Sequence, residues 1–359
     1  MSTKRVKYVV TAAAATALLL AGCGSGGEGE AGGDAGGSED AYVAFLMPDQ
    51  NSTRYDEQDA PAFTNKMSEL CPDCQVEYQN ADADVEQQQA QFEAALSNGA
   101  EVIVLDPVDT AAAAGLVQSA QSQGVAVIAY DRPIPDLPAD YYISYDNEAI
   151  GASIAQSLYD HLEENGTEGG VLQINGSPTD AAAGLIRDGV DSVVDDGPYE
   201  ELAEFDTPNW QPPKAQEFAE GAISQYGDEI IGVVAANDGT AGAAIAALQS
   251  AGMDPLPPVT GNDAEIAAIQ RIIAGTQYNT ISKPSVVVGE AAAEAAYTFI
   301  QGDTPEPDTT LFDTPSQLFE PTVVTQDNVK EVIFDGDIYT VDEVCTDEFA
   351  DACAELGIE

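Results

Sequence analysis

The chain alternates between short apolar runs and longer helical stretches, and this alternation limits the folds open to it. Runs such as VAVIAYD and IIGVVAAND have the composition of buried parallel strands. Between them lie stretches with helical periodicity, several of which end at a glycine, as at Gly99, Gly124 and Gly252. Repetition of this unit over about 300 residues predicts an α/β fold whose parallel sheets are covered by helices on both faces. So many strands exceed one compact domain, and we therefore expect two similar Rossmann-like lobes. The predicted strands are AYVAFLM, QVEYQNA, EVIVLDP, VAVIAYD, YYISYD, GGVLQING, ELAEFD, IIGVVAAND, PPVTGND and YNTISK.

The first 22 residues have the pattern of a secretory signal. Three basic residues precede an apolar stretch at 8–20, which is too short to span a membrane. The motif LAGC, which ends at Cys23, is similar to the lipobox of bacterial lipoproteins, in which this cysteine is lipidated; an ordinary signal peptide with a chance cysteine is the alternative. Residues 23–40 are rich in Gly, Ser and acids and are expected to form a flexible tether. We expect an extracytoplasmic protein held at the cell membrane by a lipidated Cys23.

Four further cysteines form two local pairs. Cys71 and Cys74 lie in the motif CPDC, and Cys345 and Cys353 flank a short acidic stretch. In an exported chain such pairs predict two disulfides. A redox motif is the alternative for CPDC, although no helix N-terminus follows to lower a thiol pKa. A zinc site is disfavoured because the pairs lie far apart and the chain has a single histidine, His161. We predict no metal and no cofactor.

The charge balance is strongly acidic, with 63 acidic and 11 basic residues and a net charge of −52. Phosphates would be repelled, so nucleic acid is excluded as a partner. Three of the 11 basic residues lie before residue 8, which leaves eight in the rest of the chain. A cation at the end of a strand is therefore a candidate for a functional role.

Polar and aromatic side chains follow the predicted strands, at the edge where open α/β sheets bind ligands. Carboxylates accept hydrogen bonds, guanidinium and ammonium groups donate them, and amides do both, so the set suits a ligand covered with hydroxyls. No nucleophile stands next to a base, and neither GxxxxGK[ST] nor GxGxxG is present, so we do not predict an enzyme. The side chains at strand ends are Arg54-Tyr55, Asp131-Arg132, Asp180, Trp210, Asn237-Asp238, Asp263 and Lys283.

Several motifs together resemble the bacterial D-xylose-binding proteins, which are substrate-binding components of sugar ABC transporters in the ribose/galactose-binding, type I periplasmic binding protein family. The similarity runs from about residue 42 to residue 284 and is weaker in the C-terminal part, where FEPTVVTQDNV still fits. It implies two lobes joined by a three-segment hinge, with sugar bound between them and closure sensed by a permease. The motifs are IAYDRPI, YYISYDNEAIG, NGSPTDAAA, AANDGTAGAAIAALQSAGM and GNDAEIAAIQRIIAGTQYNTISKP.

The resemblance assigns ligand-binding roles to eight of these side chains. The resemblance implies that most of these side chains form hydrogen bonds with ligand hydroxyls. It also implies that the ring of Tyr55, where the family commonly has Trp, stacks on the ligand and that Trp210 forms a second aromatic wall. The chain departs from the family at Ala181 and Ala182, where the xylose binders have two Asn; loss of the second Asn removes one hydrogen bond, worth about 1 kcal/mol. The eight residues are Arg54, Tyr55, Asp131, Arg132, Trp210, Asn237, Asp263 and Lys283.

Each of these residues also has a structural explanation. Asp131 and Arg132 can pair with each other, and Trp210 can be a packing residue. Asn237 or Asp238 can cap the helix that follows; we expect Asp238 to be the cap and Asn237 to face the ligand. Asp263 can likewise be a helix cap, and Lys283 a solvated turn residue.

The function predicted from the sequence is that of a lipid-anchored binding protein of a sugar ABC importer. Its ligand is a monosaccharide, with D-xylose favoured, its partners are the permease and the membrane, and it is expected to be a monomer. A sugar-sensing receptor for another aldose or signalling sugar is the alternative. The predicted segments are a signal peptide at 1–22, a tether at 23–40, a first lobe at 41–146 plus 283–311 and a second lobe at 147–282 plus 312–359.

Overall fold

The computed structural model describes residues 40–346 and 348–359. The predicted signal peptide, the lipobox with Cys23 and nearly all of the tether lie outside these residues. Within the described part no helix combines the length and apolar character needed to cross a membrane.

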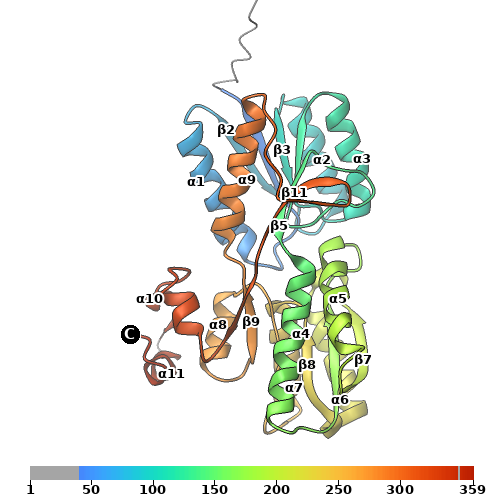
Figure 1. The fold of residues 1–359 in the computed structure, drawn as a ribbon, viewed down its shortest axis with the longest axis vertical. Helices are drawn as coiled ribbons and strands as arrows, with labels where there is room; N and C mark the ends of the chain where they lie inside the picture. Colours follow the sequence, from blue (N-terminus) through green and yellow to red (C-terminus); the bar gives the residue numbers. More distant parts are fainter. Residues whose placement is uncertain (1–39, 347) are drawn as a thin grey trace, which may run out of the picture. The chain divides into compact units, whose positions relative to one another are not determined.

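A seven-stranded sheet organises the first part of the chain, in the order β10-β11-β5-β4-β3-β1-β2 (Figure 1). All neighbours pair in parallel except β10 and β11, which form an antiparallel hairpin. The strands are β1 (Tyr42–Met47), β2 (Gln75–Asn80), β3 (Val102–Leu105), β4 (Ala126–Tyr130), β5 (Tyr141–Tyr145), β10 (Thr309–Leu311) and β11 (Thr314–Phe319).

Both faces of this sheet are buried, as its apolar runs require. Along β1, Val43, Phe45 and Met47 belong to one apolar cluster, whereas Ala44 and Leu46 belong to another, because successive side chains in a strand point to opposite faces. Helices α1 (Ala60–Leu70) and α9 (Ser285–Ile300) contribute to the first cluster, and α2 (Val85–Ser97) and α3 (Thr110–Ser122) to the second. We call this sheet with its four helices the first lobe.

The second lobe, as named here, contains a three-stranded parallel sheet in the order β7-β6-β8 and a two-stranded antiparallel sheet of β9 and β12. Its helices cover these sheets, and α4 and α5 pack closely against each other (Figure 1). The strands are β6 (Gly170–Asn175), β7 (Glu200–Asp206), β8 (Ile230–Ala235), β9 (Asn279–Ser282) and β12 (Thr322–Thr325). The helices are α4 (Asn147–Glu164), α5 (Ala181–Val194), α6 (Pro212–Tyr226), α7 (Asp238–Ser250), α8 (Ile266–Ile273), α10 (Val341–Val344) and α11 (Ala350–Glu355). Short turns of helix complete the described elements: η1 (Tyr55–Asp59), η2 (Pro208–Trp210), η3 (Gly227–Glu229) and η4 (Lys330–Phe334).

The chain passes between the two lobes three times: after β5, after β9 and after β11. Because the whole β10–β11 hairpin belongs to the first sheet, the expected boundary at residue 311 falls inside the hairpin, and the third crossing lies at 320–321. The predicted lobe boundaries otherwise stay predictions. The expected strand PPVTGND forms only an isolated bridge, between Val259 and Val233.

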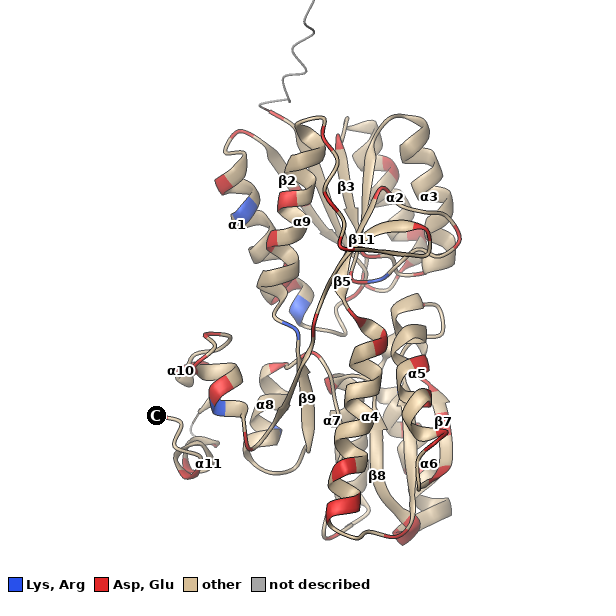
Figure 2. Ribbon diagram, viewed as in Figure 1, with Lys and Arg blue, Asp and Glu red and all other residues tan. Residues whose placement is uncertain are grey.

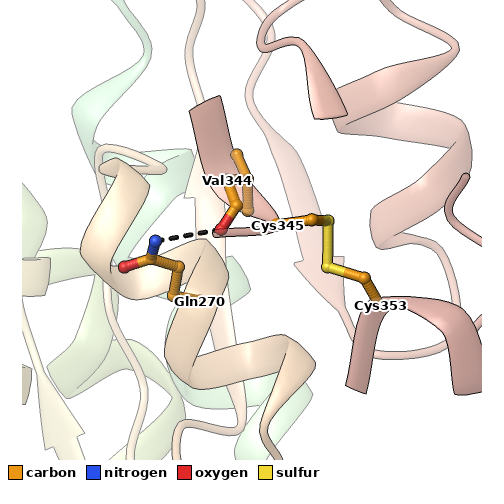
Figure 3. Close-up of a disulfide and its surroundings, with 4 residues drawn as sticks. All are labelled: Gln270, Val344, Cys345 and Cys353. Carbon is orange, nitrogen blue, oxygen red and sulfur yellow. Dashed lines mark hydrogen bonds between the residues drawn. A yellow bond between two sulfur atoms is a disulfide. The ribbon is translucent and has the colours of Figure 1, made fainter. Parts of the chain in front are cut away.

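Both cysteine pairs are bonded in the structure, Cys71 to Cys74 and Cys345 to Cys353. The second disulfide lies next to α8, where the Gln270 side chain donates to the carbonyl of Val344 at 3.0 Å (Figure 3). Cys353 is buried in an apolar cluster with residues of α8, so this bond joins the C-terminal segment to the second lobe.

Candidate functional site

The predicted site begins with Arg54, which directly precedes η1. The guanidinium holds Asp59 with two hydrogen bonds, from Nη2 at 2.7 Å and from Nε at 3.0 Å. Its Nη1 donates to Asp131 Oδ1 at 3.2 Å. Arg54 is 3% exposed, and its pKa is raised: burial opposes the charge, but Asp131 and Asp59 outweigh it. Because the planar guanidinium of Arg54 donates to two carboxylates at once, its orientation is fixed.

Asp131 and Arg132 follow β4, and the backbone explains how both side chains reach one site. Neighbouring residues of a strand point to opposite faces. Here β4 ends at Tyr130, and Asp131 adopts a φ of 58°, in the left-handed region that a non-glycine residue rarely enters. This turn carries Asp131 and Arg132 out of the strand together. Backbone strain of this kind concentrates at functional sites.

Arg132 is the most highly connected cation of the site. Its Nη2 donates to Asp49 Oδ2 at 2.9 Å and its Nη1 to the carbonyl of Pro107 at 3.1 Å. Its Nε lies 3.1 Å from Asp180 Oδ2 and 3.3 Å from Asp106 Oδ1. Asp180 belongs to the second lobe, so this guanidinium bridges the two lobes.

The carboxylates around these cations differ in charge state. Burial by itself raises the pKa of Asp131, but Arg54, Lys283 and Arg132 outweigh it, so the pKa falls well below its usual range. Asp106 behaves in the opposite way: burial dominates over Arg132 and raises its pKa. Asp106 is fully buried, and neither of its oxygens has a hydrogen-bond partner in the described structure. The two carboxyl groups of this cluster are therefore shifted in opposite directions, that of Asp131 towards the charged form and that of Asp106 towards the neutral form.

Asn237 corrects one expectation from the sequence. It is Asn237, not Asp238, that caps α7: its Oδ1 accepts from Thr240 N at 2.9 Å, in a capping box. Asp238 is the first residue of the helix, and its carboxylate instead accepts from Gln277 and Thr280, at 2.8 and 2.9 Å. Asn237 nevertheless lines the cavity described below, so the cap and the site share one residue.

Asp263 and Lys283 form the hinge side of the site. Asp263 has a φ of 104°, and its Oδ1 lies 3.0 Å from Lys283 Nζ. The same ammonium is 3.7 Å from Asp131 Oδ1, so it links carboxylates of the two lobes. Asp263 does not cap α8, whose preceding residue is Glu265. Lys283 is 7% exposed and is not a solvated turn residue.

Trp210, at the end of η2, is the aromatic side chain that the second lobe contributes to the site. Its indole Nε1 donates to Asp180 Oδ2 at 2.9 Å, and the side chain is 8% exposed. Gly176 makes room for the ring, because a Cβ at that position would lie 2.2 Å from Trp210 Cη2 and Cζ2. Gly176, which directly follows β6, therefore leaves the space that the Trp210 ring occupies.

All eight predicted residues line one cavity. The guanidinium carbons of Arg54 and Arg132 lie 5.3 and 6.0 Å from the centre of the Tyr55 ring, in cation–π geometry, and the Tyr55 hydroxyl donates to Asp131 Oδ2 at 3.2 Å. The structure thus brings together the whole set chosen from the sequence, although the role of each residue in binding stays a prediction. Three of the eight basic residues that follow residue 7 are in this wall (Figure 2 shows how few basic residues the described ribbon carries).

Six residues of the wall were not in the predicted set. Asp180 stood at a strand end but was not selected, and Asn147 follows β5, where the same strand-end rule could have found it. Asn262 is 1% exposed and its Oδ1 has no hydrogen-bond partner among the described residues. No sequence signal separates it from its neighbour Asp263. The six are Ser52, Asn147, Asp180, Ala182, Ile186 and Asn262.

The lobes touch around this cavity. Thr110 N donates to the carbonyl of Thr179 at 3.0 Å, and the Asn51 side chain donates to the carbonyl of Asn209 at 3.1 Å. Thr53 N donates to Glu265 Oε1 at 3.3 Å. With the Arg132–Asp180 pair, these contacts describe a closed arrangement of the two lobes.

The charges of the wall balance. Three cations (Arg54, Arg132, Lys283) face three acids (Asp131, Asp180, Asp263). Every cation already has an acidic partner within 3.2 Å, so the site does not offer free positive charge to an anion. It offers a dense set of fixed donors and acceptors beside an aromatic ring, which suits a neutral polyhydroxylated molecule. Among the described residues no group of three His, Cys, Asp or Glu could hold a metal ion.

Comparison with known proteins identifies the family. The periplasmic binding protein domain model matches residues 43–304. The chain belongs to this family. The resemblance expected from the motifs is confirmed, and the two sheets described above form the type I periplasmic binding protein fold.

Individual relatives cover most of the chain. The D-xylose-binding periplasmic protein of Escherichia coli K12 is 34% identical over 308 residues, 83% of this chain and 91% of that protein. The multiple sugar-binding periplasmic receptor ChvE of Rhizobium radiobacter is 30% identical over 294 residues, 75% of this chain and 83% of that protein. The structure is similar to an ABC transporter solute-binding protein of Clostridium phytofermentans solved with β-D-glucose: TM-score 0.76, 27% identity, 84% of this chain and 99% of that one.

Proposed function

We propose that the protein binds a neutral monosaccharide between its two lobes and delivers it to an ABC permease, with D-xylose as the first candidate. The observation that carries this proposal is the charge-balanced wall of eight predicted residues around one cavity. The names of the two relatives, a D-xylose-binding protein and a multiple sugar-binding receptor, support the ligand class.

Binding by this site depends on prepositioned groups. Arg54 and Arg132 have their planes fixed by carboxylates, so little side-chain entropy is lost when a hydroxyl arrives. Asn237 and Asp263 offer an amide and a carboxylate from the second lobe, and Trp210 offers an apolar face for ring C–H groups. A ligand with a missing or inverted hydroxyl leaves one of these groups buried and unpaired, which is the basis of specificity.

The site is poorly suited to glycoside hydrolysis, which needs one carboxyl group as a general acid and a second as a base or nucleophile. The pKa of Asp131 is lowered once its cations outweigh burial, so it does not hold a proton for a leaving group. Lys283 lies between Asp131 and Asp263 and pairs with both. We therefore infer a binding protein that makes and breaks no bonds.

Calorimetric titration tests the ligand class. D-xylose, D-ribose, L-arabinose, D-glucose and D-galactose are titrated in parallel into the purified chain, and we expect saturable binding of at least one aldose with D-xylose among the tightest. If Trp210→Ala and Asp263→Ala bind D-xylose as tightly as the unaltered chain, the binding site does not lie in this cavity. Absence of heat with every sugar would reject the ligand class.

We also propose that the protein acts outside the cytoplasmic membrane, as a monomer anchored by a lipid at Cys23. The motif LAGC supports the anchor, and it lies outside the described residues. Metabolic labelling with a fatty acid tests it: label is expected in the unaltered chain and not in Cys23→Ala, and equal labelling of both would reject it.

A further inference from the structure

One part of the cavity wall is apolar. Helix α5 contributes two aliphatic side chains to it, Ala182 and Ile186, which are 6% and 3% exposed. Residues four apart lie above one another on the same face of a helix. The two side chains therefore form a continuous apolar strip, whereas carboxylates, amides and cations dominate the rest of the wall.

The strip is held firmly in place. Asp180 caps α5 by accepting from Ala182 N at 2.8 Å, and its other oxygen accepts from Trp210 Nε1 at 2.9 Å and lies 3.1 Å from Arg132 Nε. Helix α5 also packs on α4 without space to move: a Cβ at Gly151 would lie 1.9 Å from the carbonyl oxygen of Ile186. Neither Asp180 nor a rotation of α5 can therefore bring a new polar partner to this strip.

A ligand hydroxyl pointed at the strip would lose water and gain no hydrogen bond. Around the edge of an aldopyranose ring, C1 to C4 each bear a hydroxyl, and only the part at C5 and the ring oxygen can be free of hydroxyls; the C–H groups on the faces of the ring are the ones proposed to meet Trp210. That edge is a methylene in a pentopyranose, carries a methyl in a 6-deoxyhexose and carries a hydroxymethyl in a hexose. The strip therefore fits the first two chemistries better than the third.

Building on the proposed function, we propose that Ala182 and Ile186 contact the C5 edge of a bound aldopyranose and set specificity there. The protein accepts hydrogen or methyl at C5 and discriminates against hydroxymethyl. Its ligand class is then the aldopentopyranoses together with the 6-deoxyaldohexoses of the same ring configuration.

Two matched series test this by calorimetry on the purified chain. D-xylose, 6-deoxy-D-glucose and D-glucose share the configuration of C1 to C4 and differ only at C5; L-arabinose, 6-deoxy-D-galactose and D-galactose form a second such series. In the series that binds, we expect the 6-deoxy sugar within about tenfold of the pentose, and the hexose about 10- to 100-fold weaker than the 6-deoxy sugar, the range in which an apolar pocket rejects an added hydroxyl.

A hexose that binds as tightly as its 6-deoxy counterpart would overturn the inference while leaving sugar binding intact. Failure of every sugar in both series would reject the proposed function, and the inference with it. The two failures are therefore distinguishable in one experiment, and neither depends on a variant that folds.

A substitution then locates the effect. Ala182→Asn places an amide in the strip, so we expect the preference for the 6-deoxy sugar over the hexose to shrink at least threefold. Ala181→Asn is the matched control, because Ala181 is the neighbouring residue and does not line the cavity. In this variant the preference for the 6-deoxy sugar over the hexose should stay unchanged. An equal shift of the preference in both variants, or none in Ala182→Asn, would show that the strip is not the determinant.

Discussion

The two sides of the cavity are built differently. On the first lobe's side, Arg54 and Arg132 are locked by carboxylates at 2.7–3.3 Å, and both are almost fully buried. On the second lobe's side the groups that line the cavity include neutral amides, and Asn262 keeps an oxygen without a partner in the described structure. On the first side the guanidinium donors are largely taken up by carboxylates, including Asp180 across the cavity, whereas the second side leaves hydrogen-bonding capacity for a ligand. We infer that the first side sets stability and the second sets specificity.

Removal of a cation from the first side gives the largest expected effect. Arg132→Ala strands Asp49 and Asp180 without their cation, and breaking a buried pair typically costs about 3–5 kcal/mol. We expect a loss of unfolding free energy of that order in urea titrations, together with loss of sugar binding. Arg187→Ala is the matched control, because that side chain is 43% exposed and its acidic partners are 33–41% exposed; it should cost less than about 1 kcal/mol. Similar losses in the two variants would contradict the comparison.

The second side should make stability depend on pH. Two acids that interact with Asp263 have raised pKa values. Burial is the main cause and the neighbouring acids are the second; together they raise the pKa of Glu265 to about 8 and that of Asp238 to about 7. The folded state then holds protons that the unfolded state releases near its ordinary values of 4.5 and 3.8. The stabilising contribution of these two groups is therefore fully present below about pH 4 and is lost as the pH rises towards 8.

Urea unfolding at pH 5, 6.5 and 8 measures this slope. Glu265→Gln removes one of the two titrating groups while leaving an oxygen to accept from Thr53 N, so it should flatten the slope by about half. A slope equal to that of the unaltered chain would assign the pH dependence to other groups.

Asn237→Ala separates the two roles of a residue on the second side. Loss of a helix cap costs about 1 kcal/mol of stability, and loss of the ligand contact should weaken sugar binding by about tenfold. Asp109→Ala is the matched control, because Asp109 caps α3 in the same way, through Ala112 N at 2.8 Å, and does not line the cavity. The control should lose stability and keep its affinity; equal affinity losses in the two variants would show that the effect comes from the cap alone.

Asn262→Ala should give the smallest change in stability and the clearest separation of stability from sugar affinity. Its Oδ1 is buried and has no hydrogen-bond partner within residues 40–346 and 348–359, so removing it should leave the unfolding free energy unchanged or slightly higher. Sugar affinity should fall, because the cavity loses an acceptor that nothing else occupies. Stability lost with affinity kept would reverse the interpretation of this residue.

The sequence was informative where local chemistry decides the outcome. Most of the strands from β1 to β9 are buried apolar runs, although β2 and β7 are more polar and only partly buried. The strand-end rule with the family motifs found eight residues of one cavity. Strands β10, β11 and β12 were not predicted, because they are short or only partly buried and do not form apolar runs of the kind that marked the other strands. Asn237 and Asp238 were interchanged because both can cap a helix and only the backbone angles distinguish them.

Other wall residues depend on tertiary packing. Ile186 reaches the cavity because α5 packs tightly on α4 through Gly151, which periodicity alone does not reveal. Asn262 points to the same cavity as Asp263 because the latter adopts a φ of 104°. Such residues need the fold, not the local pattern, to be recognised.

The central claim, that a sugar occupies this cavity, is tested most directly by tryptophan fluorescence. The chain has a single Trp, Trp210, and it lies in the cavity wall, so its emission reports on this site. We predict a saturable change in emission on titration with D-xylose or the tightest aldose, with the same midpoint as in calorimetry. Sugar binding measured by calorimetry with no change in Trp210 emission would contradict the account.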